Sequence, residues 1–372
     1  MNILVACGGT AGHINPAIAI ANEMKLRHPD ANILFVGTEN NREADLIPRA
    51  GYKIEFVKAN GFTRAKTFKA AKHNIKALMT FAKTSLKLRK IIKDFAPDVA
   101  IGTGGFVSAP VMYTASKMKI PCVIHEQNAF AGVTTKMLAP RVNKIFLSFP
   151  IKNKLDCPDS KCLLTGNPIK REFLSKTREE ARRELGIDDD VPVVLSCGGS
   201  LGARQINDAF CVMAKLSAEE GIVTHYHGAS ADYKRVLETL GDTASAPNLN
   251  ILGYIYNMPT VMAAADIVIN RSGAMTLTEI AALGKASILI PSPNVAENHQ
   301  YYNAKTYSDV GAAVLIEEKD LDGENLYALV KELCSDRARL HQMEKAALTL
   351  AKTDAAARIC EETEKLIESL RK

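Results

Sequence analysis

The chain opens on Leu4-Val5-Ala6-Cys7-Gly8-Gly9-Thr10-Ala11-Gly12 and repeats the pattern as Val194-Leu195-Ser196-Cys197-Gly198-Gly199-Ser200-Leu201-Gly202. Each copy is a short apolar run, then a glycine turn, then an amphipathic segment of helix length. Glycines let backbone N–H groups approach an anion closely, and the following helix adds the positive end of its dipole. Two such turns in matching positions predict two similar α/β domains with a ligand cleft between them.

Composition agrees with a globular protein of about two domains. The 372 residues are 47% hydrophobic and 24% charged. No run of about 18 apolar residues occurs, and the first residues enter a predicted strand without a signal-peptide n-region, so we expect neither a membrane span nor a leader. The eight cysteines show no metal-ligand spacing, which favours free thiols in a reducing compartment over disulfides.

Short β-rich runs alternate with helix-length segments along the whole chain. This alternation predicts the α/β class, with two doubly wound Rossmann-like domains built on parallel sheets. Prolines and glycines cluster at 150–170, so we place an N-terminal domain at 1–163 and a C-terminal domain at 164–353. The charged amphipathic segment 354–372 is expected to be a helix that packs back on the first domain.

The first glycine turn departs from the dinucleotide fingerprint and lacks the acidic residue expected after the second strand, which disfavours NAD. His13 follows this turn at the start of a helix. Two interpretations stay open, a capping residue and a general base whose neutral form the helix dipole favours.

Polar residues also follow later predicted strands of the first half. A further glycine cluster spans Gly102 to Phe106, and His125-Glu126-Gln127-Asn128 closes the next strand. Such side chains at a strand's carboxyl end usually face a ligand. Asn128 suits sugar hydroxyls because it both donates and accepts. The residues alone do not decide whether Glu126 orients a neighbouring histidine.

In the second half, Arg271-Ser272-Gly273-Ala274 opens a predicted helix that carries Glu279. The Glu279 carboxylate could chelate a ribose diol or be a solvated surface group, and Gln300 is another two-way hydrogen-bonding group. His225 and His227 lie two apart on a predicted strand, but no third ligand stands nearby, so a metal site there is not expected.

From Arg64 to Lys93 the chain has ten Lys or Arg and no acidic residue. On a helix from about residue 69, lysines gather on one arc beside apolar residues, which favours an anionic membrane surface. A solvated helix packed on its own sheet is the alternative, and sparse aromatic residues disfavour nucleic acid. The expected membrane contacts are Lys69, Lys72, Ile75, Lys76, Met79 and Lys83.

The sequence resembles the bacterial undecaprenyldiphospho-muramoylpentapeptide β-N-acetylglucosaminyltransferases, a glycosyltransferase family 28 group, in motifs that follow in order over nearly the whole chain. These motifs are Gly8-Gly9-Thr10-Ala11-Gly12-His13 with Asn15-Pro16, Gly104-Gly105-Phe106-Val107-Ser108, His125-Glu126-Gln127-Asn128, Gly166-Asn167-Pro168, Gly198-Gly199-Ser200-Leu201-Gly202-Ala203, Arg271-Ser272-Gly273-Ala274 and Asn298-His299-Gln300. The resemblance implies a two-domain GT-B fold. It also implies inverting transfer of N-acetylglucosamine from UDP-GlcNAc to the C4 hydroxyl of the muramoyl sugar of lipid I, giving lipid II.

By position, the resemblance implies that His13 is the base on the acceptor hydroxyl. It implies a donor site in the C-terminal domain, with the diphosphate at Ser200, uracil at the backbone of Ile255 and the ribose diol at Glu279. The implied substrate contacts are Thr10, Ala11, Gly12, Asn128, Lys170, Arg171, Ser200, Ile255, Ala274, Met275, Thr276, Leu277, Thr278, Glu279 and Gln300. Many members carry Arg where this chain has Lys170 followed by Arg171, so which of the two reaches the donor stays open.

We expect no cofactor and no obligatory metal, because no Asp-x-Asp motif is present and backbone N–H groups can stabilise a departing diphosphate. The expected partners are UDP-GlcNAc, lipid I and anionic inner-leaflet lipids at the cytoplasmic face of the membrane, without nucleic acid. Proteins of the wall-synthesis machinery are further candidate partners. The alternatives are a UDP-sugar epimerase of the same fold and a non-catalytic UDP-sugar-binding protein at the membrane surface.

Overall fold

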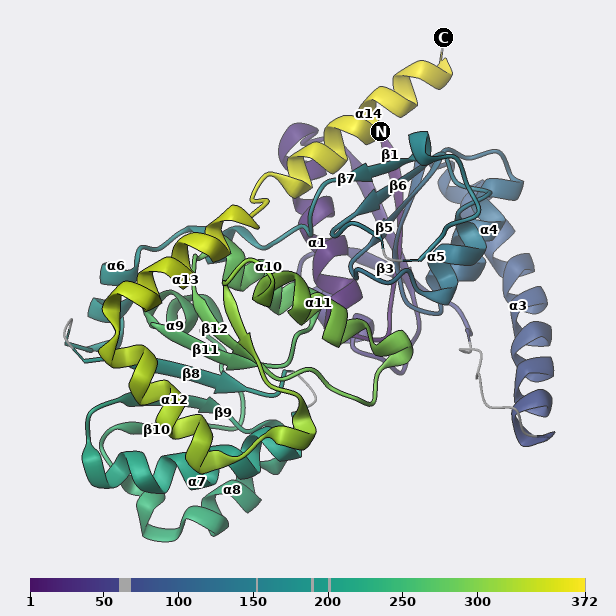
Figure 1. Cartoon of the computed structure of the whole chain (residues 1–372). Coiled ribbons are helices and arrows are strands. Elements are labelled where there is room, and N and C mark those ends of the chain that lie inside the picture. Colours follow the sequence, from purple (N-terminus) through teal and green to yellow (C-terminus); the bar gives the residue numbers. More distant parts are fainter. Residues whose placement is uncertain (60–67, 152, 189–190, 200–201, 372) are drawn as a thin grey trace. The chain divides into compact units, whose positions relative to one another are not determined.

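The computed structural model describes residues 1–59, 68–151, 153–188, 191–199 and 202–371, without side chains at 68–79, 82, 296 and 371. The chain divides into two compact units, each a parallel sheet with helices on its faces (Figure 1). Unit 1 comprises Met1–Ile169 with Thr353–Lys372, and unit 2 comprises Lys170–Lys352. The sequence-based boundary after residue 163 falls inside β7 (Cys162–Leu164), which pairs with β6 and so stays in unit 1.

The unit 1 sheet has seven parallel strands in the order β3-β2-β1-β4-β5-β6-β7. These are β1 Asn2–Cys7, β2 Asn32–Gly37, β3 Lys53–Phe56, β4 Val99–Gly104, β5 Cys122–Glu126, β6 Lys144–Leu147 and β7 Cys162–Leu164. The strand order reverses between β1 and β4. Ligands of doubly wound folds bind at this point, beyond the carboxyl ends of the strands.

Two apolar cores cover the two faces of this sheet, as the alternation of side chains along a strand requires. Ile3 and Val5 of β1 pack with α1 and α14, whereas Leu4 and Ala6 pack with α3, α4 and α5. The unit 1 helices are α1 Ala11–Arg27, α2 Glu43–Arg49, α3 Phe68–Phe95, α4 Ser108–Lys117, α5 Val133–Leu138 and α14 Ala355–Arg371, with a 3-10 turn at Asp159–Lys161.

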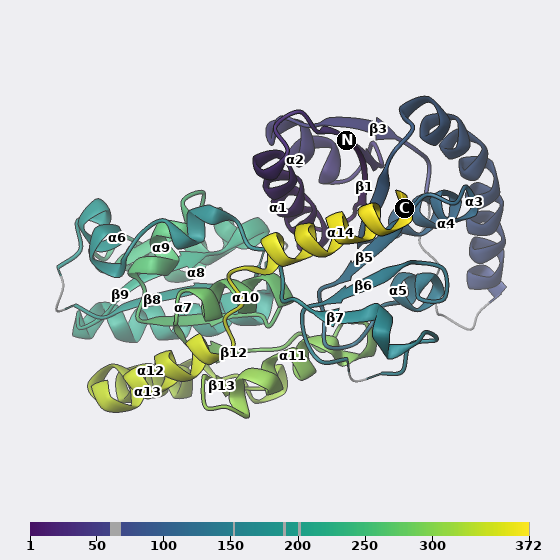
Figure 2. The same cartoon turned by 90° about the horizontal axis from the view of Figure 1, so that it is seen from above.

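The C-terminal helix α14 lies along α1 in unit 1 (Figure 2). The Glu364 carboxylate pairs with Arg27 (Nη2–Oε2 2.5 Å) and accepts from His28 at 2.8 Å, and Glu362 pairs with Lys144. Ile359 is fully buried against the same core. Residues far apart in the sequence therefore complete one face of unit 1. Among the residues described, no helix is long and apolar enough to cross a bilayer.

The unit 2 sheet has six parallel strands in the order β10-β9-β8-β11-β12-β13, with its reversal between β8 and β11. The strands are β8 Val193–Cys197, β9 Thr224–Gly228, β10 Leu249–Leu252, β11 Ile267–Asn270, β12 Ala286–Leu289 and β13 Ala313–Leu315. The helices are α6 Arg178–Leu185, α7 Arg204–Glu220, α8 Tyr233–Leu240, α9 Met258–Ala264, α10 Ala274–Ala282, α11 His299–Ser308, α12 Gly323–Ser335 and α13 Arg337–Thr349. Short 3-10 turns lie at Arg171–Leu174, Ser230–Asp232, Gly241–Ser245, Ala296–Asn298 and Glu318–Asp320.

Candidate functional site

The first glycine turn joins β1 to α1 at the strand-order reversal of unit 1. A buried carboxylate, Glu43, lies against it and accepts hydrogen bonds from the Gly9 N–H (2.9 Å), the Thr38 N–H (3.1 Å) and the Thr38 hydroxyl (2.6 Å). At Gly9 the prediction of an anion cradle is therefore wrong, because the protein's own carboxylate takes that N–H. No local pattern pointed to Glu43, which lies 34 residues from Gly9.

The later glycine cluster packs directly on this turn. Gly104 has a φ of +106°, and a Cβ on it would lie 2.7 Å from the His13 Nδ1 atom. Gly105 has a φ of +79°, and a Cβ there would lie 2.1 Å from the Gly8 carbonyl oxygen. Only glycine suits both the backbone conformation and the close approach. The end of β4 is therefore shaped around the His13 ring.

A chain of hydrogen bonds fixes the His13 imidazole. The Gln127 amide nitrogen lies 2.6 Å from the Thr103 carbonyl oxygen, which can only accept, so the amide oxygen faces His13. That oxygen lies 3.0 Å from His13 Nδ1, which must therefore donate. A neutral His13 thus carries its proton on Nδ1 and presents a bare Nε2.

His125 closes the far end of this chain. Its Nε2–H donates to the Gly166 carbonyl at 3.0 Å, and its Nδ1 accepts from the Gln127 amide at 3.0 Å. Complete burial lowers the pKa of His125 to about 4, and nearby His13 contributes to the effect. His125 is therefore neutral near pH 7. One chain of hydrogen bonds, in which each group donates to the next, runs from His13 through Gln127 and His125 to the Gly166 carbonyl (the hydrogen-bond relay).

In the relay a second group orients a candidate base: the neutral Gln127 amide orients the His13 ring. Sequence reasoning placed Gln127 at a strand end but missed this contact, which spans 114 positions. Nothing in local spacing reveals such a distance. The alternative that Glu126 orients a histidine is wrong, because it accepts from the backbone of Asn128 (3.1 Å) and Gly132 (3.0 Å) and from the Thr135 hydroxyl (2.5 Å).

The other predicted contacts of unit 1 surround the relay unevenly. Thr10 is exposed at the N-terminus of α1 and makes no side-chain cap there, and Ala11 and Gly12 form the first turn. Asn128 is partly buried beyond β5, beside Glu126. Unit 1 therefore offers an uncapped helix N-terminus and a bare imidazole nitrogen at the switch point of its sheet.

In unit 2 the second glycine turn follows β8, again at the strand-order reversal. The Gly199 carbonyl accepts from the Gly202 N–H (3.0 Å) and from the Ser230 hydroxyl (3.2 Å). Ser200, the predicted diphosphate contact, lies outside the described residues.

The neighbouring strand β11 ends in buried polar atoms without partners. Among the described residues, Asn270 Oδ1 and Ser272 Oγ are buried and have no hydrogen-bond partner. Asn270 uses its amide nitrogen on Cys197 at 2.9 Å. Unsatisfied buried polar groups are uncommon and often mark functional sites. Their position at the switch point makes this end of β11 the best candidate for a ligand site in unit 2.

Helix α10 begins directly after these atoms and carries Glu279. Loss of solvent raises the pKa of Glu279 to about 8, although part of the residue stays accessible, and Lys170 opposes the rise. In the described part of the chain no hydrogen-bond donor contacts this carboxyl group. The 3-10 turn that begins at Arg171 packs against α10. Of the residues predicted to contact the sugar-nucleotide donor, Lys170 is thus the one whose charge acts on Glu279.

The remaining predicted residues of α10 mostly face inward. Ala274, Met275, Leu277 and Thr278 are buried, and the Thr278 hydroxyl donates to the Ala274 carbonyl at 2.9 Å. Any contact from the buried apolar members must therefore use backbone atoms. Thr276 is half-buried.

Two side chains brace the loop that follows β12. Arg271 donates to the carbonyls of Ile290 (3.1 Å) and Pro291 (3.2 Å) and pairs with Glu318. Gln300 Oε1 accepts from the Ser292 N–H at 2.9 Å. Ile255, the predicted uracil contact, lies beyond β10 with a buried side chain, so only its backbone is available to a ligand.

The histidines of β9 are structural. His227 hydrogen bonds Ser196 (2.8 Å) and Asn207 (3.2 Å), and Phe210 stacks on its ring at 3.7 Å. Burial lowers the pKa of His225 to about 4 and that of His227 to about 3. No group of three candidate metal ligands occurs among the described residues.

The predicted membrane contacts lie on α3. Lys83 is exposed, and Leu86 is 69% exposed on the same helix. The side chains of Lys69, Lys72, Ile75, Lys76 and Met79 lie outside the described part of the chain.

Comparison with known proteins gives the family. Residues 3–147 match the glycosyltransferase family 28 N-terminal domain, and residues 193–359 match the family 28 C-terminal domain. The chain is 45% identical to the UDP-N-acetylglucosamine–N-acetylmuramyl-(pentapeptide) pyrophosphoryl-undecaprenol N-acetylglucosamine transferase of Acetivibrio thermocellus, over 97% of each chain.

Solved structures show the same fold. The crystal structure of Acinetobacter baumannii MurG matches with a TM-score of 0.76 at 24% identity, covering 98% of this chain and 99% of that one. A UDP-GlcNAc 2-epimerase from Neisseria meningitidis matches with a TM-score of 0.68 at 14% identity, covering 98% and 100%. The fold alone therefore does not separate transferase from epimerase, whereas the curated relative does. The chain belongs to glycosyltransferase family 28, in the group of UDP-N-acetylglucosamine–N-acetylmuramyl-(pentapeptide) pyrophosphoryl-undecaprenol N-acetylglucosamine transferases.

Proposed function

We propose that this protein transfers N-acetylglucosamine from UDP-GlcNAc to the C4 hydroxyl of the muramoyl sugar in lipid I, giving lipid II with inversion at the anomeric carbon. The hydrogen-bond relay is the observation that carries the proposal. In the neutral ring it holds the proton on Nδ1 and leaves Nε2 to accept, at the switch point of unit 1. Family membership supplies the donor and acceptor classes.

In the proposed reaction the acceptor C4 oxygen attacks the anomeric carbon of GlcNAc. A bond forms between these two atoms, and the bond from the anomeric carbon to the diphosphate oxygen breaks. The hydroxyl proton passes to His13 Nε2, and its positive charge is balanced by the UDP that departs with the bonding electron pair. General base catalysis of this type contributes about 10²- to 10⁴-fold.

We assign the donor to unit 2. The orphaned atoms of Asn270 and Ser272, together with the N-terminus of α10, would receive polar groups of the nucleotide. The Glu279 carboxyl group, which accepts no hydrogen bond from the described residues, would bind the ribose diol. Backbone N–H groups at helix N-termini, with Lys170 or Arg171, would stabilise the charge that develops on UDP.

We further propose that the protein works at the cytoplasmic face of the cell membrane as a peripheral protein, with α3 on anionic lipids. Lys83 and the exposed Leu86 are the described part of this surface. The four predicted lysine contacts, Lys69, Lys72, Lys76 and Lys83, changed together to Gln should weaken binding to anionic vesicles by on the order of 10²- to 10³-fold, at about 1 kcal/mol per lysine. The matched control changes four exposed lysines of unit 2, Lys215, Lys234, Lys305 and Lys319. Equal loss in both quadruple variants would contradict the assignment to α3.

The test of the activity is incubation of the purified protein with UDP-GlcNAc radiolabelled in the sugar and a lipid I analogue. We expect label in the lipid fraction only when the acceptor is present. Conversion of UDP-GlcNAc to a second UDP-sugar without acceptor would instead support the epimerase. Tight donor binding with neither product would support the non-catalytic alternative.

A further inference from the structure

A cavity of about 260 Å³ lies in unit 2 at the amino ends of its strands, whereas the candidate donor site lies at their carboxyl ends. Asp266 and Lys285 directly precede β11 and β12, so the cavity opens at the amino ends of these strands. Asn270 lies at the carboxyl end of β11, about 13 Å along the strand at about 3.3 Å per residue, and α10 begins beyond it and runs back so that its last residue, Ala282, lines the cavity. The residues that line it and matter here are Phe173, Leu174, Lys176, Arg178, Leu283 and Lys285.

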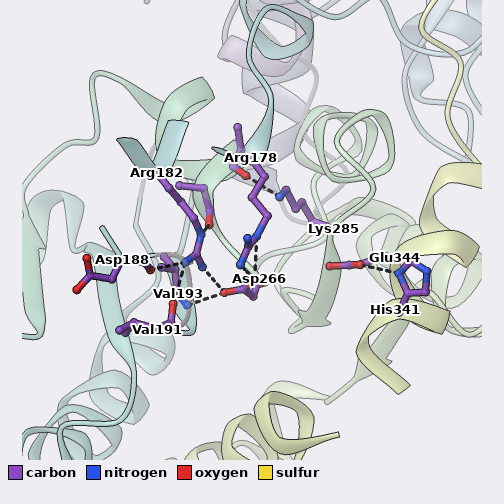
Figure 3. A network of polar contacts seen from close by, with 11 residues as sticks. Arg178, Arg182, Asp188, Val191, Val193, Asp266, Lys285, His341 and Glu344 are labelled. Atoms are coloured by element: carbon purple, nitrogen blue, oxygen red, sulfur yellow. Dashed lines mark hydrogen bonds and ion pairs between the residues drawn. The ribbon is translucent and has the colours of Figure 1, made fainter. Parts of the chain in front are cut away.

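Asp266, the carboxylate that pairs with Arg178 of the lining, is already saturated. Asp266 accepts from Arg178 (Nη2–Oδ1 2.7 Å), from Arg182 (Nη2–Oδ2 2.6 Å) and from the Val193 N–H (2.8 Å), as Figure 3 shows. Asp266 is 2% exposed and Arg182 is fully buried. The two arginines therefore neutralise the charge of Asp266, and together with the Val193 N–H they occupy its hydrogen-bond acceptor positions.

Lys285 is a buried cation that makes no direct ion pair among the described residues, although the charges of Asp266 and Glu344 act on it from farther away. It is 5% exposed, and its amine donates one hydrogen bond, to the Ala263 carbonyl at 2.6 Å. No drawn contact joins it to a carboxylate in Figure 3. An ammonium group has three donors, and a buried charge is costly unless it is paired. Burial accordingly lowers the pKa of Lys285 to about 8.

The charges around Lys285 come from several elements. Arg178, Arg182 and Glu179 lie on α6, Asp266 precedes β11, and Glu344 lies on α13. Arg178 uses Nε and Nη2 on Asp266, which leaves its Nη1 without a partner in the described part of the chain.

The other lining groups give the cavity an apolar side. Lys176 is paired with Glu184 at 2.5 Å and lies on the rim. Phe173 is buried and Leu174 is 45% exposed, so apolar surface borders the unpaired donors.

We propose that this cavity, the Lys285 pocket, binds a small organic oxyanion. The carboxylate or phosphate of the ligand pairs with Lys285 and Arg178, and its short apolar portion packs on Leu174 and Leu283. The site is separate from the sugar-transfer reaction and does not depend on the proposed function. A bound anion supplies the direct ion pair that the buried amine does not make within the described residues.

The test is calorimetric titration of the full-length protein saturated with UDP, which keeps the probe anions out of the donor site. The probes are phenyl phosphate, benzoate and inorganic phosphate. We expect one saturable site for phenyl phosphate or benzoate, with inorganic phosphate at least several-fold weaker. Absence of saturable binding of both aromatic anions, or inorganic phosphate binding as tightly as they do, would overturn the proposal.

Variants locate the site. Lys285→Met should weaken the aromatic anion at least tenfold, because it removes the unpaired charge at nearly constant volume. The control Lys305→Met removes an exposed lysine of the same unit, paired with Asp309, and should bind as the unchanged protein does. Equal affinity in the Lys285 and Lys305 variants would place the anion elsewhere and refute the Lys285 pocket.

A second measurement needs no variant. The intact protein is treated briefly with acetic anhydride, and acetylation of each lysine is followed by peptide mass spectrometry. Phenyl phosphate or benzoate should slow acetylation of Lys285 several-fold and leave Lys305 unchanged. Unprotected Lys285 at saturating anion would contradict the proposal even if Lys285→Met did not fold.

Discussion

The two glycine turns share one sequence pattern, but the carboxylate near each turn differs in the hydrogen bonds that it accepts. In unit 1, Glu43 is buried and accepts three hydrogen bonds, one of them from Gly9 in the turn itself. In unit 2, Glu279 has no hydrogen-bond donor in the described part of the chain, and its pKa is raised to about 8. The first carboxylate completes the fold, whereas the second is available to a ligand.

This difference assigns separate tasks to the two units. The first turn is satisfied internally at Gly9, and its remaining contribution is to place His13 at the start of α1. Within the described residues of unit 2, the buried atoms Asn270 Oδ1 and Ser272 Oγ stay unsatisfied, and Glu279 lies on the helix that follows them. On our proposal, similar sequence patterns thus place a base in one unit and bind the donor in the other.

The sharpest test of the comparison is His13→Ala. We expect the turnover number for GlcNAc transfer to fall about 10³-fold, because a general base of this kind contributes about 10²- to 10⁴-fold. Donor affinity, measured by UDP-GlcNAc titration, should change less than twofold, because we assign the donor to unit 2. The control His341→Ala alters an exposed histidine of α13. A large loss of donor affinity in His13→Ala would break the division of tasks.

Gln127→Leu tests the relay with a smaller expected effect. Removing the acceptor of the Nδ1 proton frees the His13 tautomer, so turnover should fall about 10- to 100-fold at constant donor KM. Nitrogen NMR of labelled histidines should then show an Nε2-protonated His13. A fall in turnover with an unchanged tautomer would assign Gln127 a packing role only.

Glu43→Gln addresses the satisfied carboxylate. A glutamine would turn its N–H₂ group toward N–H and O–H groups whose hydrogen bonds Glu43 accepts. The free energy of unfolding of unit 1 in urea should therefore fall by about 1–3 kcal/mol. Glu39→Gln is the control, because Glu39 is exposed in the same connection. Unchanged stability together with weakened donor binding would show that Glu43 serves the ligand instead.

Glu279→Gln addresses the unsatisfied carboxyl group through pH. Its folded pKa is raised, so the unfolded chain loses this proton near pH 4.5 while the folded protein keeps it to about pH 8. Between these values the folded state binds more protons, and stability falls as the pH rises.

Relative to the unchanged protein, Glu279→Gln should therefore gain about 1–2 kcal/mol between pH 5 and pH 8, a value reduced for the remaining solvent access. Thermal unfolding across this range measures it, with the exposed Glu238→Gln as control. Parallel pH profiles for both variants would contradict the raised pKa.

Local patterns were sufficient for the alternation of strands and helices, apart from β7, and for the positions of His13 and Glu279 on helices that follow strands. Periodicity and glycine turns report on neighbouring residues, and these features are local. The contacts that define the chemistry join distant positions, as between Gln127 and His13 or Glu43 and Gly9. No spacing rule reaches across such separations, so the sequence alone left the role of Glu126 open and predicted an anion at the first turn.

The tautomer of His13 decides whether the hydrogen-bond relay prepares Nε2 to accept a proton. Long-range nitrogen–proton NMR of histidine-labelled protein, with the His13 signals assigned from their loss in His13→Ala, reports which ring nitrogen carries the proton. We expect the proton of the neutral His13 ring on Nδ1, with a bare Nε2. A proton on Nε2 would contradict the relay and remove His13 as the base.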